Sequence, residues 1–368
     1  MLDTNIYDIA IIGAGPAGCA AALGLGKSGL KVALIDKDRF PREKACGDAI
    51  PGPAISTLEK AFPFFQDEFF NLKKKHRIRS SSIILNNGRS IDYYWKLPAY
   101  NIKRSLFDAF LLKLVRKYAS VDILTEWAVN EINPGTPHLI KSKNAGKSIK
   151  AKFIIGCDGV NSITAKVFQQ TANSKQQTVF AVRAYYKGVK LDPDTNFFYI
   201  LKKYLPGYFW AFPLGNDVFN VGFGMKTDRA GKVPLKMKEV LSEFIRSGQV
   251  KDAFAGSQQL SENSGAIIPI GGKHGSYSGD GYLLTGDAAH LADPLQGHGI
   301  DKAIVSGLLA ARHTANCFKE DDLSADFNAN YDLSIKIGIG RELRKNRRKQ
   351  LMLAMFPFLL RIYAMLRK

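Results

Sequence analysis

Hydrophobic and polar positions divide the start of the chain into two apolar runs around a glycine-rich turn. The run YDIAIIGAG, which begins at Tyr7, is almost continuously apolar and predicts a buried strand. The segment PAGCAAALGLGKSG is rich in small helix formers, and LKVALID predicts a second strand that ends in an acid. A strand, a turn, a helix and a strand in this order predict a βαβ unit between Ile6 and Ile35.

The middle of the chain has a different pattern, in which apolar and polar positions alternate and aromatic residues are frequent. The runs SIILNNGRSIDYYW, TVFAVRAYYKGV, NFFYILKKYLPGYFWAFPL and DVFNVGFGM predict strands of an antiparallel sheet. Buried runs of the parallel type return in AKFIIGCDGVNS and in DGYLLTGDAAHLADPLQGHGIDKAIVSGLLAARHTA. We therefore expect a discontinuous α/β domain of three segments, 1–48, 100–170 and 278–330. An antiparallel substrate-binding domain, 49–99 and 171–277, is inserted between these segments, and a helical tail, 331–368, follows.

The turn after the first strand carries a dinucleotide-binding fingerprint. Gly13, Gly15 and Gly18 lead into the helix, and Asp36 ends the second strand eighteen residues after Gly18. The first glycine permits a tight turn, the second lets the backbone approach a pyrophosphate, and the third lets the helix pack on the strand. The helix amino terminus offers N–H groups to the phosphates, and Asp36 can accept a hydrogen bond from a ribose hydroxyl. The alternative is a glycine-rich turn in a sheet protein that binds no nucleotide.

Length and cysteine usage narrow the possibilities. A chain of 368 residues exceeds the usual single domain of about 100–200 residues, which favours two lobes. The four cysteines include no CxxC pair and no metal-like grouping with histidine. We therefore expect free thiols, no metal site and a reducing, cytoplasmic location. We also expect no targeting segment, because the first strand begins at once.

The formal net charge of +19 favours an anionic partner. Six of the nine residues 341–349 are basic, and the apolar run LMLAMFPFLLRIYAML follows them. This run is shorter than the roughly 20 residues that span a bilayer, and Pro357 interrupts it. It predicts peripheral association with the inner face of an anionic membrane, although packing on the enzyme's own core is the alternative. The aromatic residues of this apolar tail are Phe356, Phe358 and Tyr363. Nucleic acid is a weaker candidate, because the chain has no recognisable module for it.

Three later segments resemble motifs of the flavoproteins of the p-hydroxybenzoate hydroxylase superfamily. The segment RSLFDAFLL resembles their R-x-x-F-D-x-x-L motif, IIGCDGVNS their D-G motif, and LLTGDAAHLADPLQGHGI their second FAD motif. The resemblance implies FAD as the cofactor. It also implies an α/β fold with a Rossmann-like FAD-binding domain of the glutathione-reductase type, an inserted antiparallel β-sheet substrate domain and a C-terminal helical tail. We find no second nucleotide fingerprint, so NAD(P)H or another electron donor would bind transiently.

The same resemblance assigns cofactor-binding roles to individual residues. Arg104 would lie near the FAD phosphates or ribityl chain, and Asp158 and Gly159 would lie near the pyrophosphate. Asp287 could accept a hydrogen bond from a ribityl hydroxyl. The alternatives are a solvated surface arginine for Arg104 and a structural turn for Asp158 and Gly159. The turn that would bring N–H groups to the flavin consists of Gly297, Gly299 and Ile300.

Two segments are more specifically similar to the geranylgeranyl reductase family. The segment KACGD resembles the family's K-x-C-G-G element, and GYFWAFPLGNDVFNVGFG resembles its Y-x-W-x-F-P segment followed by N-V-G. The chain departs from this pattern at Asp48, which replaces the second glycine, and at His298, where the family form has glutamate. Flavin-dependent halogenases carry two tryptophans flanking one residue in a related element. Tyr208 and Trp210 occupy those positions here, which argues against halogenation.

The finer resemblance implies a reaction. It implies an FAD-dependent reductase that saturates carbon–carbon double bonds of a prenyl, geranylgeranyl-type chain on a lipid or quinone, with hydride from flavin N5. Cys46 would donate or relay the proton, or fix the alkene over the flavin, with His298 as a second candidate and His290 as a weaker one. For Cys46 a buried filler role and, least favoured, a disulfide are the alternatives. The alternative function is a class A flavin monooxygenase that hydroxylates an aromatic or polyketide substrate.

A prenyl chain requires an apolar cavity. We expect four residues of the aromatic segment to line it, and their alternative is ordinary core packing. These residues are Tyr208, Trp210, Phe212 and Pro213.

Overall fold

The computed structural model describes residues 6–169, 178–227, 237–271 and 276–355, which form two compact units. The first unit comprises Met1–Arg42, Ser105–Gln176 and Pro269–Lys345. The second comprises Glu43–Arg104, Gln177–Ile268 and Asn346–Lys368. These units differ from the expected ranges at every internal boundary. Residues 43–48 and 100–104 belong to the second unit, and residues 171–176, 269–277 and 331–345 belong to the first.

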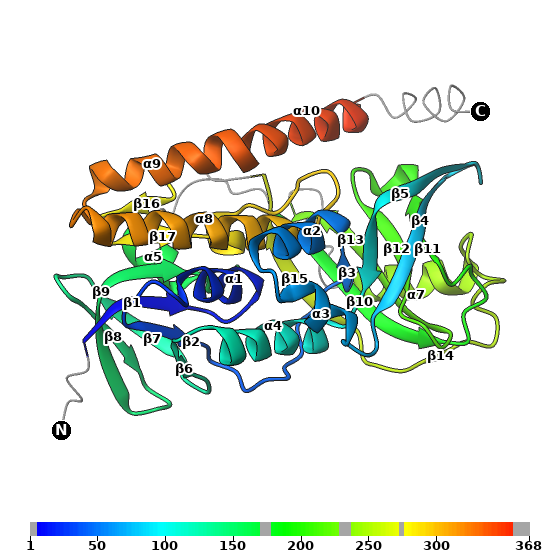
Figure 1. Cartoon of the computed structure of the whole chain (residues 1–368). Helices are drawn as coiled ribbons and strands as arrows, with labels where there is room; N and C mark the ends of the chain where they lie inside the picture. Colours follow the sequence, from blue (N-terminus) through cyan, green and yellow to red (C-terminus); the bar gives the residue numbers. More distant parts are fainter. Residues whose placement is uncertain (1–5, 170–177, 228–236, 272–275, 356–368) are drawn as a thin grey trace. The chain divides into compact units, whose positions relative to one another are not determined.

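The first unit is built on a mainly parallel sheet (Figure 1). Strands β17, β9, β1, β2 and β6 lie in this order and pair in parallel, and β16, β8 and β7 add antiparallel pairs. Every residue of β2 is buried, which explains why the pattern there is continuously apolar. The strand bounds are β1 Ile6–Ile12, β2 Val32–Ile35, β6 Asp122–Leu124, β7 Val129–Asn133, β8 His138–Ser142, β9 Lys147–Gly156, β16 Ser278–Gly279 and β17 Tyr282–Leu284.

Helix–helix contact in the first unit depends on small side chains. A Cβ atom built on Gly307 of α8 would lie 2.2 Å from the carbonyl oxygen of Ala17 in α1, so the two helices approach backbone to backbone there. Gly24 of α1 lies against the side chain of Ala311 of α8, with its built Cβ atom 2.8 Å from the Ala311 Cβ. The main helices are α1 Pro16–Leu25, α4 Arg104–Tyr118, α5 Ile163–Gln169, α8 Ile300–Lys319 and α9 Ala325–Ile335.

The second unit is built on a sheet in the order β14-β10-β13-β12-β11-β4-β5-β3, with β15 beside β10. Strand β11 pairs with β4 in parallel, whereas the pairs β10–β13, β10–β14, β11–β12, β12–β13, β3–β5 and β4–β5 are antiparallel. The two kinds of sheet confirm the mixed α/β class. The strand bounds are β3 Ala49–Ile50, β4 His76–Leu85, β5 Ser90–Asn101, β10 Thr178–Lys187, β11 Thr195–Ile200, β12 Tyr208–Pro213, β13 Val218–Lys226, β14 Gln258–Gln259 and β15 Ser264–Pro269. The helices are α2 Gly52–Ala61, α3 Phe65–Phe70 and α7 Met237–Ser247.

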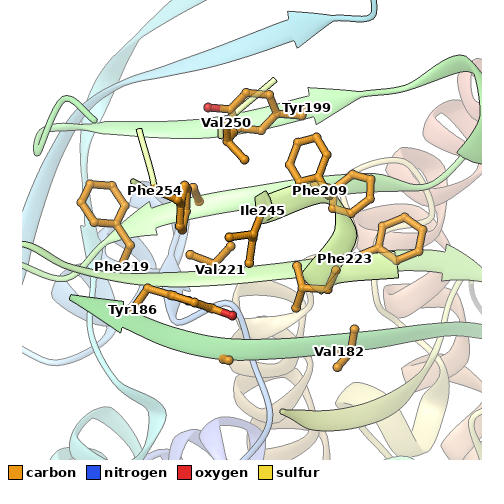
Figure 2. Packing of buried hydrophobic residues seen from close by; sticks show 14 of the residues in the cluster. Val182, Tyr186, Tyr199, Phe209, Phe219, Val221, Phe223, Ile245, Val250 and Phe254 are labelled. Carbon is orange, nitrogen blue, oxygen red and sulfur yellow. The ribbon is translucent and has the colours of Figure 1, made fainter. Parts of the chain in front are cut away.

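Strand alternation gives this second sheet two chemically different faces. One face packs against α7 and forms a hydrophobic core rich in phenylalanine (Figure 2). Its strand residues include Val182, Tyr186, Phe209, Phe219, Val221 and Phe223. The residues between them point to the opposite face, because successive side chains of a strand alternate. We call this opposite face the aromatic face, and its residues include Tyr185, Tyr208, Trp210, Phe212 and Asn220.

The C-terminal part that the structure describes continues the helices of the first unit. A π-helical turn, Lys336–Gly340, leads into α10, Arg341–Met355. Lys302 of α8 pairs with Glu342 at 2.5 Å, and Leu343 is buried. The apolar tail containing Phe356, Phe358 and Tyr363 lies outside the described residues. No helix within the described ranges has both the length and the apolar character that a bilayer crossing requires.

Candidate functional site

The fingerprint turn of the first unit requires glycine at two positions for reasons of space. Gly13 has φ +103°, and a Cβ atom there would lie 2.4 Å from the Cys157 carbonyl oxygen. A Cβ atom on Gly18 would lie 1.8 Å from the Gly13 carbonyl oxygen, which no side chain tolerates. These contacts pack α1 onto strands β1 and β9, as the pattern predicts.

Gly15 is different, because the space around it is open. It is the N-cap of α1, with no side-chain cap, and a Cβ atom built there meets only the Arg42 Nη2 atom, at 3.7 Å. Helix N–H groups and a guanidinium therefore border one open space, which is the environment that a pyrophosphate requires. Arg42 is held by Asp108 at 3.2 Å. Arg42 lies outside the glycine motif, so no sequence signal predicts its place beside Gly15.

Asp36 supports the turn with both carboxylate oxygens. Oδ2 accepts a hydrogen bond from the Ala14 N–H at 2.7 Å, and Oδ1 accepts one from the Asp38 N–H at 2.9 Å. A carboxylate offers about four lone-pair positions, so capacity remains for a ribose hydroxyl. Ribose binding by Asp36 stays a prediction.

The D-G motif mainly stabilises its own turn. Asp158 accepts hydrogen bonds from the Ser162 hydroxyl at 2.6 Å and from the Thr164 N–H at 3.0 Å, at the start of α5. Burial raises the pKa of Asp158 and these hydrogen bonds oppose the increase. Gly159 has φ +76° and open space beside it. The contacts of Asp158 are those of the structural-turn alternative, whereas Gly159 leaves room for a ligand.

Arg104 begins α4, and only 5% of its surface is exposed. Its backbone N–H donates to Asp48 Oδ1 at 3.1 Å. A solvated surface arginine is therefore excluded. Contact with FAD remains a prediction.

The second FAD motif forms a compact turn before α8. The Asp293 carboxylate accepts the N–H groups of Leu295 and Gln296, both at 2.8 Å. Gly297 has φ +72°, and Gly299 is the N-cap of α8 with no side-chain cap. The sequence analysis did not identify Asp293, although an aspartate just before a proline and a glycine turn is a common turn signal.

Asp287 lies close to this helix end. A Cβ atom on Gly299 would lie 3.4 Å from Asp287 Oδ1, so the carboxylate and the uncapped amino end of α8 are neighbours. Ile300, the first residue of α8, is buried. The arrangement offers both an acceptor and backbone donors, the two groups that the resemblance assigns to this turn.

His298 is held on both ring nitrogens. Nδ1 lies 2.8 Å from Asp301 Oδ1 and Nε2 lies 2.7 Å from Gln296 Oε1. Burial lowers the pKa of His298, but the hydrogen bond and charge of Asp301, with Asp293, outweigh both this effect and the repulsion from Lys302, so the pKa is raised. With both nitrogens engaged, His298 is better placed to fix the turn than to donate a proton. His290 is buried at φ +58° and ends the 3₁₀ turn Gly286–Ala289, which is also a structural position.

The KACGD segment lies in the second unit, where one buried carboxylate fixes it. Asp48 is fully buried, and its Oδ2 accepts hydrogen bonds from the Tyr185 hydroxyl and the Asn220 amide, both at 2.8 Å. The same amide donates to the Cys46 carbonyl oxygen at 2.8 Å. Burial raises the pKa of Asp48, and its hydrogen bonds oppose the increase. We call Asp48, Tyr185 and Asn220 the Asp48 clamp.

The backbone of Asp48 explains its place in the motif. Its φ is +63°, in the left-handed region that glycine adopts without cost and aspartate tolerates better than most residues. The family form has glycine at this position. Asp48 therefore adopts a conformation that glycine also adopts, and its carboxylate binds Tyr185 and Asn220 of the sheet.

The clamp holds Cys46 and Gly47 over the aromatic face. A Cβ atom on Gly47 would lie 3.2 Å from the Phe212 ring, and one on Gly222 would lie 2.1 Å from the Trp210 ring. Trp210 therefore lies flat on Gly222, and its Nε1–H donates to Asn220 Oδ1 at 2.9 Å. All four cysteines are free thiols, and Cys46 is half-buried whereas the other three are buried. A disulfide is thus absent and a fully buried filler role is excluded for Cys46.

The aromatic face continues away from Cys46 across the neighbouring strands. The Phe198 ring lies 5.0 Å from that of Phe212 and 5.6 Å from that of Tyr208, between centroids. Phe198 pairs directly with Ile83 of β4, and Ile83 pairs with Ile91 of β5. Since directly paired residues share a face, one apolar strip crosses β12, β11, β4 and β5.

One predicted lining residue does not belong to this strip. Pro213 pairs with Phe219, which packs in the core beside α7, so alternation places Pro213 on the α7 side of the sheet. The sequence analysis grouped it with Tyr208, Trp210 and Phe212 because it adjoins them in the chain. Within the strip, Tyr208 and Phe198 are partly buried, whereas Trp210 and Phe212 are buried.

Known protein families match both the fingerprint region and the aromatic sheet. The geranylgeranyl reductase catalytic domain family matches residues 177–265, and the glucose inhibited division protein A family matches residues 8–181. Digeranylgeranylglycerophospholipid reductase of Methanocella arvoryzae is 29% identical over 351 residues, which cover 92% of this chain and 85% of the relative. Menaquinone reductase of Mycobacterium tuberculosis is 28% identical over 318 residues, covering 83% and 75%.

Solved structures share the fold. A geranylgeranyl bacteriochlorophyll reductase-like protein from Thermoplasma acidophilum aligns with a TM-score of 0.84 at 24% identity, covering 96% of this chain and 88% of that one. The flavin-dependent halogenase CmlS aligns with a TM-score of 0.75 at 20% identity, covering 91% and 62%. The fold, the fingerprint and these relatives define an FAD-dependent oxidoreductase. Within that class, the chain is similar to the geranylgeranyl reductase family.

Replacing Gly15 by alanine should weaken FAD binding without unfolding the protein. The new methyl group enters the open space at the start of α1, so we expect the Kd for FAD to rise at least about tenfold and the free energy of unfolding of the apoprotein to change by less than about 0.5 kcal/mol. Titration of FAD fluorescence and urea unfolding measure the two quantities. Gly338→Ala, also at an open position, is the matched control and should leave the Kd unchanged. Equal FAD affinity in wild type and Gly15→Ala would contradict this cofactor site.

Substitutions of Asp48 should separate its backbone role from its carboxylate role. Asp48→Gly removes the carboxylate but keeps φ +63° at no cost, whereas Asp48→Ala also adds left-handed strain. Both leave the Tyr185 and Asn220 donors without their acceptor, at about 1–3 kcal/mol. We expect Asp48→Ala to be less stable than Asp48→Gly by about a further 1 kcal/mol in urea unfolding. Equal losses of unfolding free energy in the two variants would show that the positive φ at position 48 does not disfavour alanine.

The charge on His298 should make stability depend on pH. Because its folded pKa is raised, the stabilisation is fully present below the unfolded pKa of about 6.5 and is lost as pH rises through the folded pKa. The wild type should therefore exceed His298→Gln in free energy of unfolding by more at pH 5.5 than at pH 9. His313, whose pKa burial lowers, is the control with the opposite sign: the corresponding difference for His313→Gln should shrink at low pH. If the difference in free energy of unfolding between wild type and His298→Gln were the same at both pH values, the raised pKa of His298 would be refuted.

Proposed function

We propose that this flavoprotein saturates carbon–carbon double bonds of a prenyl chain carried on a lipid or quinone. The single observation that carries the proposal is that the half-buried Cys46 has its carbonyl oxygen fixed by the Asp48 clamp, next to Gly47, which lies against the Phe212 ring of the apolar strip. The relatives support it, because they are named for reduction of a digeranylgeranyl phospholipid and of menaquinone. An apolar strip that crosses four strands suits a long hydrocarbon chain better than a compact aromatic substrate.

Saturation of an isolated double bond needs a hydride for one carbon and a proton for the other. Bound FAD in its reduced form would supply the hydride, with NAD(P)H or another transient donor restoring the electrons. In the proposed reaction the Cys46 S–H bond breaks, the proton forms the second C–H bond, and the thiolate regains a proton from water. The alkene is reduced by two electrons and the bound cofactor is oxidised by two. Cys46 has the alternative role of fixing the alkene.

The residues around Cys46 would act by positioning. An unactivated alkene accepts hydride poorly, so its placement must supply much of the rate. Trp210, Phe212 and Phe198 would hold the chain and exclude water from it, while Asn220 fixes the Cys46 backbone. The glycine turns of the first unit, with Arg42, Asp287 and the start of α8, are the residues that we propose hold FAD.

We also propose a peripheral position on the inner face of the cytoplasmic membrane, because prenyl lipids and quinones reside in bilayers. Residues 341–349 support this proposal. Arg341, Arg344, Lys345, Arg348 and Lys349 are exposed on α10 and could attract anionic headgroups.

The reaction is tested by mass spectrometry after anaerobic incubation of the chemically reduced holoprotein with a geranylgeranyl phospholipid or with menaquinone. We expect a gain of about two mass units per saturated bond together with flavin reoxidation. Reoxidation only when oxygen is admitted, with no mass gain for either compound, would overturn the reductase and favour the monooxygenase.

The role of Cys46 is tested in the same assay. Cys46→Ala and Cys46→Ser should keep bound FAD and its reduction, but lose about 100-fold or more in turnover if the thiol donates the proton. Cys317→Ala, which removes a buried thiol of α8, is the control and should keep turnover. Full turnover by Cys46→Ala would show that the thiol only packs.

A further inference from the structure

The outer end of the second sheet carries an unusual exposed segment. Strands β4 and β5 form a long hairpin (Figure 1), and their register shifts between the pairs Ser80–Tyr94 and Ile78–Ala99. Across this shift one residue of β4 faces residues 95–98 of β5, so these four residues bulge from the ladder. Every residue from 94 to 98 is exposed. The bulge therefore presents side chains outward instead of pairing them.

Large apolar groups are exposed in this bulge and at Tyr94, which directly precedes it. Tyr94 is 81% exposed, Trp95 is 41% exposed and Leu97 is 44% exposed. The other two tryptophans, Trp127 and Trp210, are only 6% and 7% exposed. Trp95 also has a fixed orientation, because its Nε1–H donates to Ser81 Oγ at 3.2 Å. Exposed apolar residues gathered at one bulge, here Trp95 and Leu97, mark an interaction surface.

Basic residues accompany these apolar groups. Five of the seven residues 73–79 are Lys or Arg, and Lys96 lies within the bulge. Lys73, Lys74, Arg77 and Arg79 are exposed on and before β4, which pairs with β5. Asp194 offsets part of this charge by pairing with Arg79 at 3.2 Å. The surface remains basic, with aromatic residues at its centre.

We propose that this surface, the β5 edge, docks on an anionic lipid bilayer. Tryptophan and tyrosine favour the headgroup level of a bilayer, and lysine and arginine are attracted to anionic lipids. A second copy of the chain is a poorer occupant, because the same edge would bring like charges together. The proposal concerns a surface other than residues 341–349, and it requires no catalytic activity.

The position of the β5 edge gives docking a consequence for the proposed reaction. Ser81, which holds Trp95, pairs with Tyr93, and the next pair along this face is Ile83 with Ile91. Those two isoleucines belong to the apolar strip of the aromatic face. A prenyl chain leaving the bilayer at the β5 edge would therefore enter the strip over apolar side chains without crossing water.

Trp95 provides a selective reporter of docking. The holoprotein is mixed with vesicles of phosphatidylglycerol or of phosphatidylcholine, and both cosedimentation and tryptophan emission are recorded at low and high salt. We expect binding to phosphatidylglycerol that weakens with salt, together with a blue shift of emission that is absent in Trp95→Phe. Emission of Trp127 and Trp210 should not change, because both are buried.

Charge substitutions test the surface further. Lys73→Gln/Lys74→Gln/Arg77→Gln should lower the partition coefficient for phosphatidylglycerol vesicles by about 100-fold. Lys187→Gln/Lys190→Gln/Lys251→Gln, three exposed lysines elsewhere in the second unit, is the matched control with the same change of charge and should lower it much less.

Three outcomes would overturn the proposal. They are the absence of binding to anionic vesicles at low salt, binding without a shift of the Trp95 emission, and a concentration-dependent dimer that Trp95→Phe abolishes. The assay involves no turnover, so its failure would leave the proposed reductase reaction standing. Failure of the reductase assay with intact vesicle binding would likewise leave the docking surface standing.

Discussion

The arrangement of the second unit depends on one buried carboxylate. Asp48 has no exposed surface and satisfies its oxygens with three donors from three separate segments: the Tyr185 hydroxyl, the Asn220 amide and the Arg104 N–H. A buried carboxyl group without such partners would cost several kcal/mol, so the segment that carries it has one favourable position on the sheet. The Asn220 amide extends this constraint to the Cys46 backbone. The location of the half-buried thiol therefore follows from a residue two positions away.

The two faces of the second sheet have different roles: one forms the hydrophobic core, and the other carries the proposed substrate strip. Phenylalanine and valine at one parity of the strands build a closed core with α7, as Figure 2 shows. Residues of the other parity form the aromatic face, and Gly222 lets the Trp210 indole lie against the backbone. Glycine in a strand interior normally weakens the strand, and here it creates the flat aromatic surface. A chain with this alternation can carry an apolar strip without exposing its core.

Much of the fold and part of the site could be predicted from local sequence. The βαβ unit, the three-piece α/β domain pattern and the glycine contacts of Gly13 and Gly18 follow from periodicity and from short spacings. Arg42, Tyr185, Asn220 and Asp293 could not be found in this way, because their roles depend on partners distant in the chain or on turn geometry. Pro213 was misplaced because adjacency in sequence is not adjacency on a face. The sequence shows Asp48 as a departure from a family pattern, but only its φ of +63° and its buried hydrogen bonds explain what it does.

The most direct test of the account is whether a prenyl chain covers Cys46. The three other cysteines are buried, so carboxymethylation of the folded holoprotein by iodoacetate reports on this thiol. The rate of Cys46 modification, followed by peptide mass spectrometry, is measured with and without a saturated geranylgeranyl-type lipid that binds but cannot react. The account predicts that the lipid slows modification by about tenfold or more at saturation. An unchanged rate at lipid concentrations that saturate binding would place the chain elsewhere and contradict the central claim.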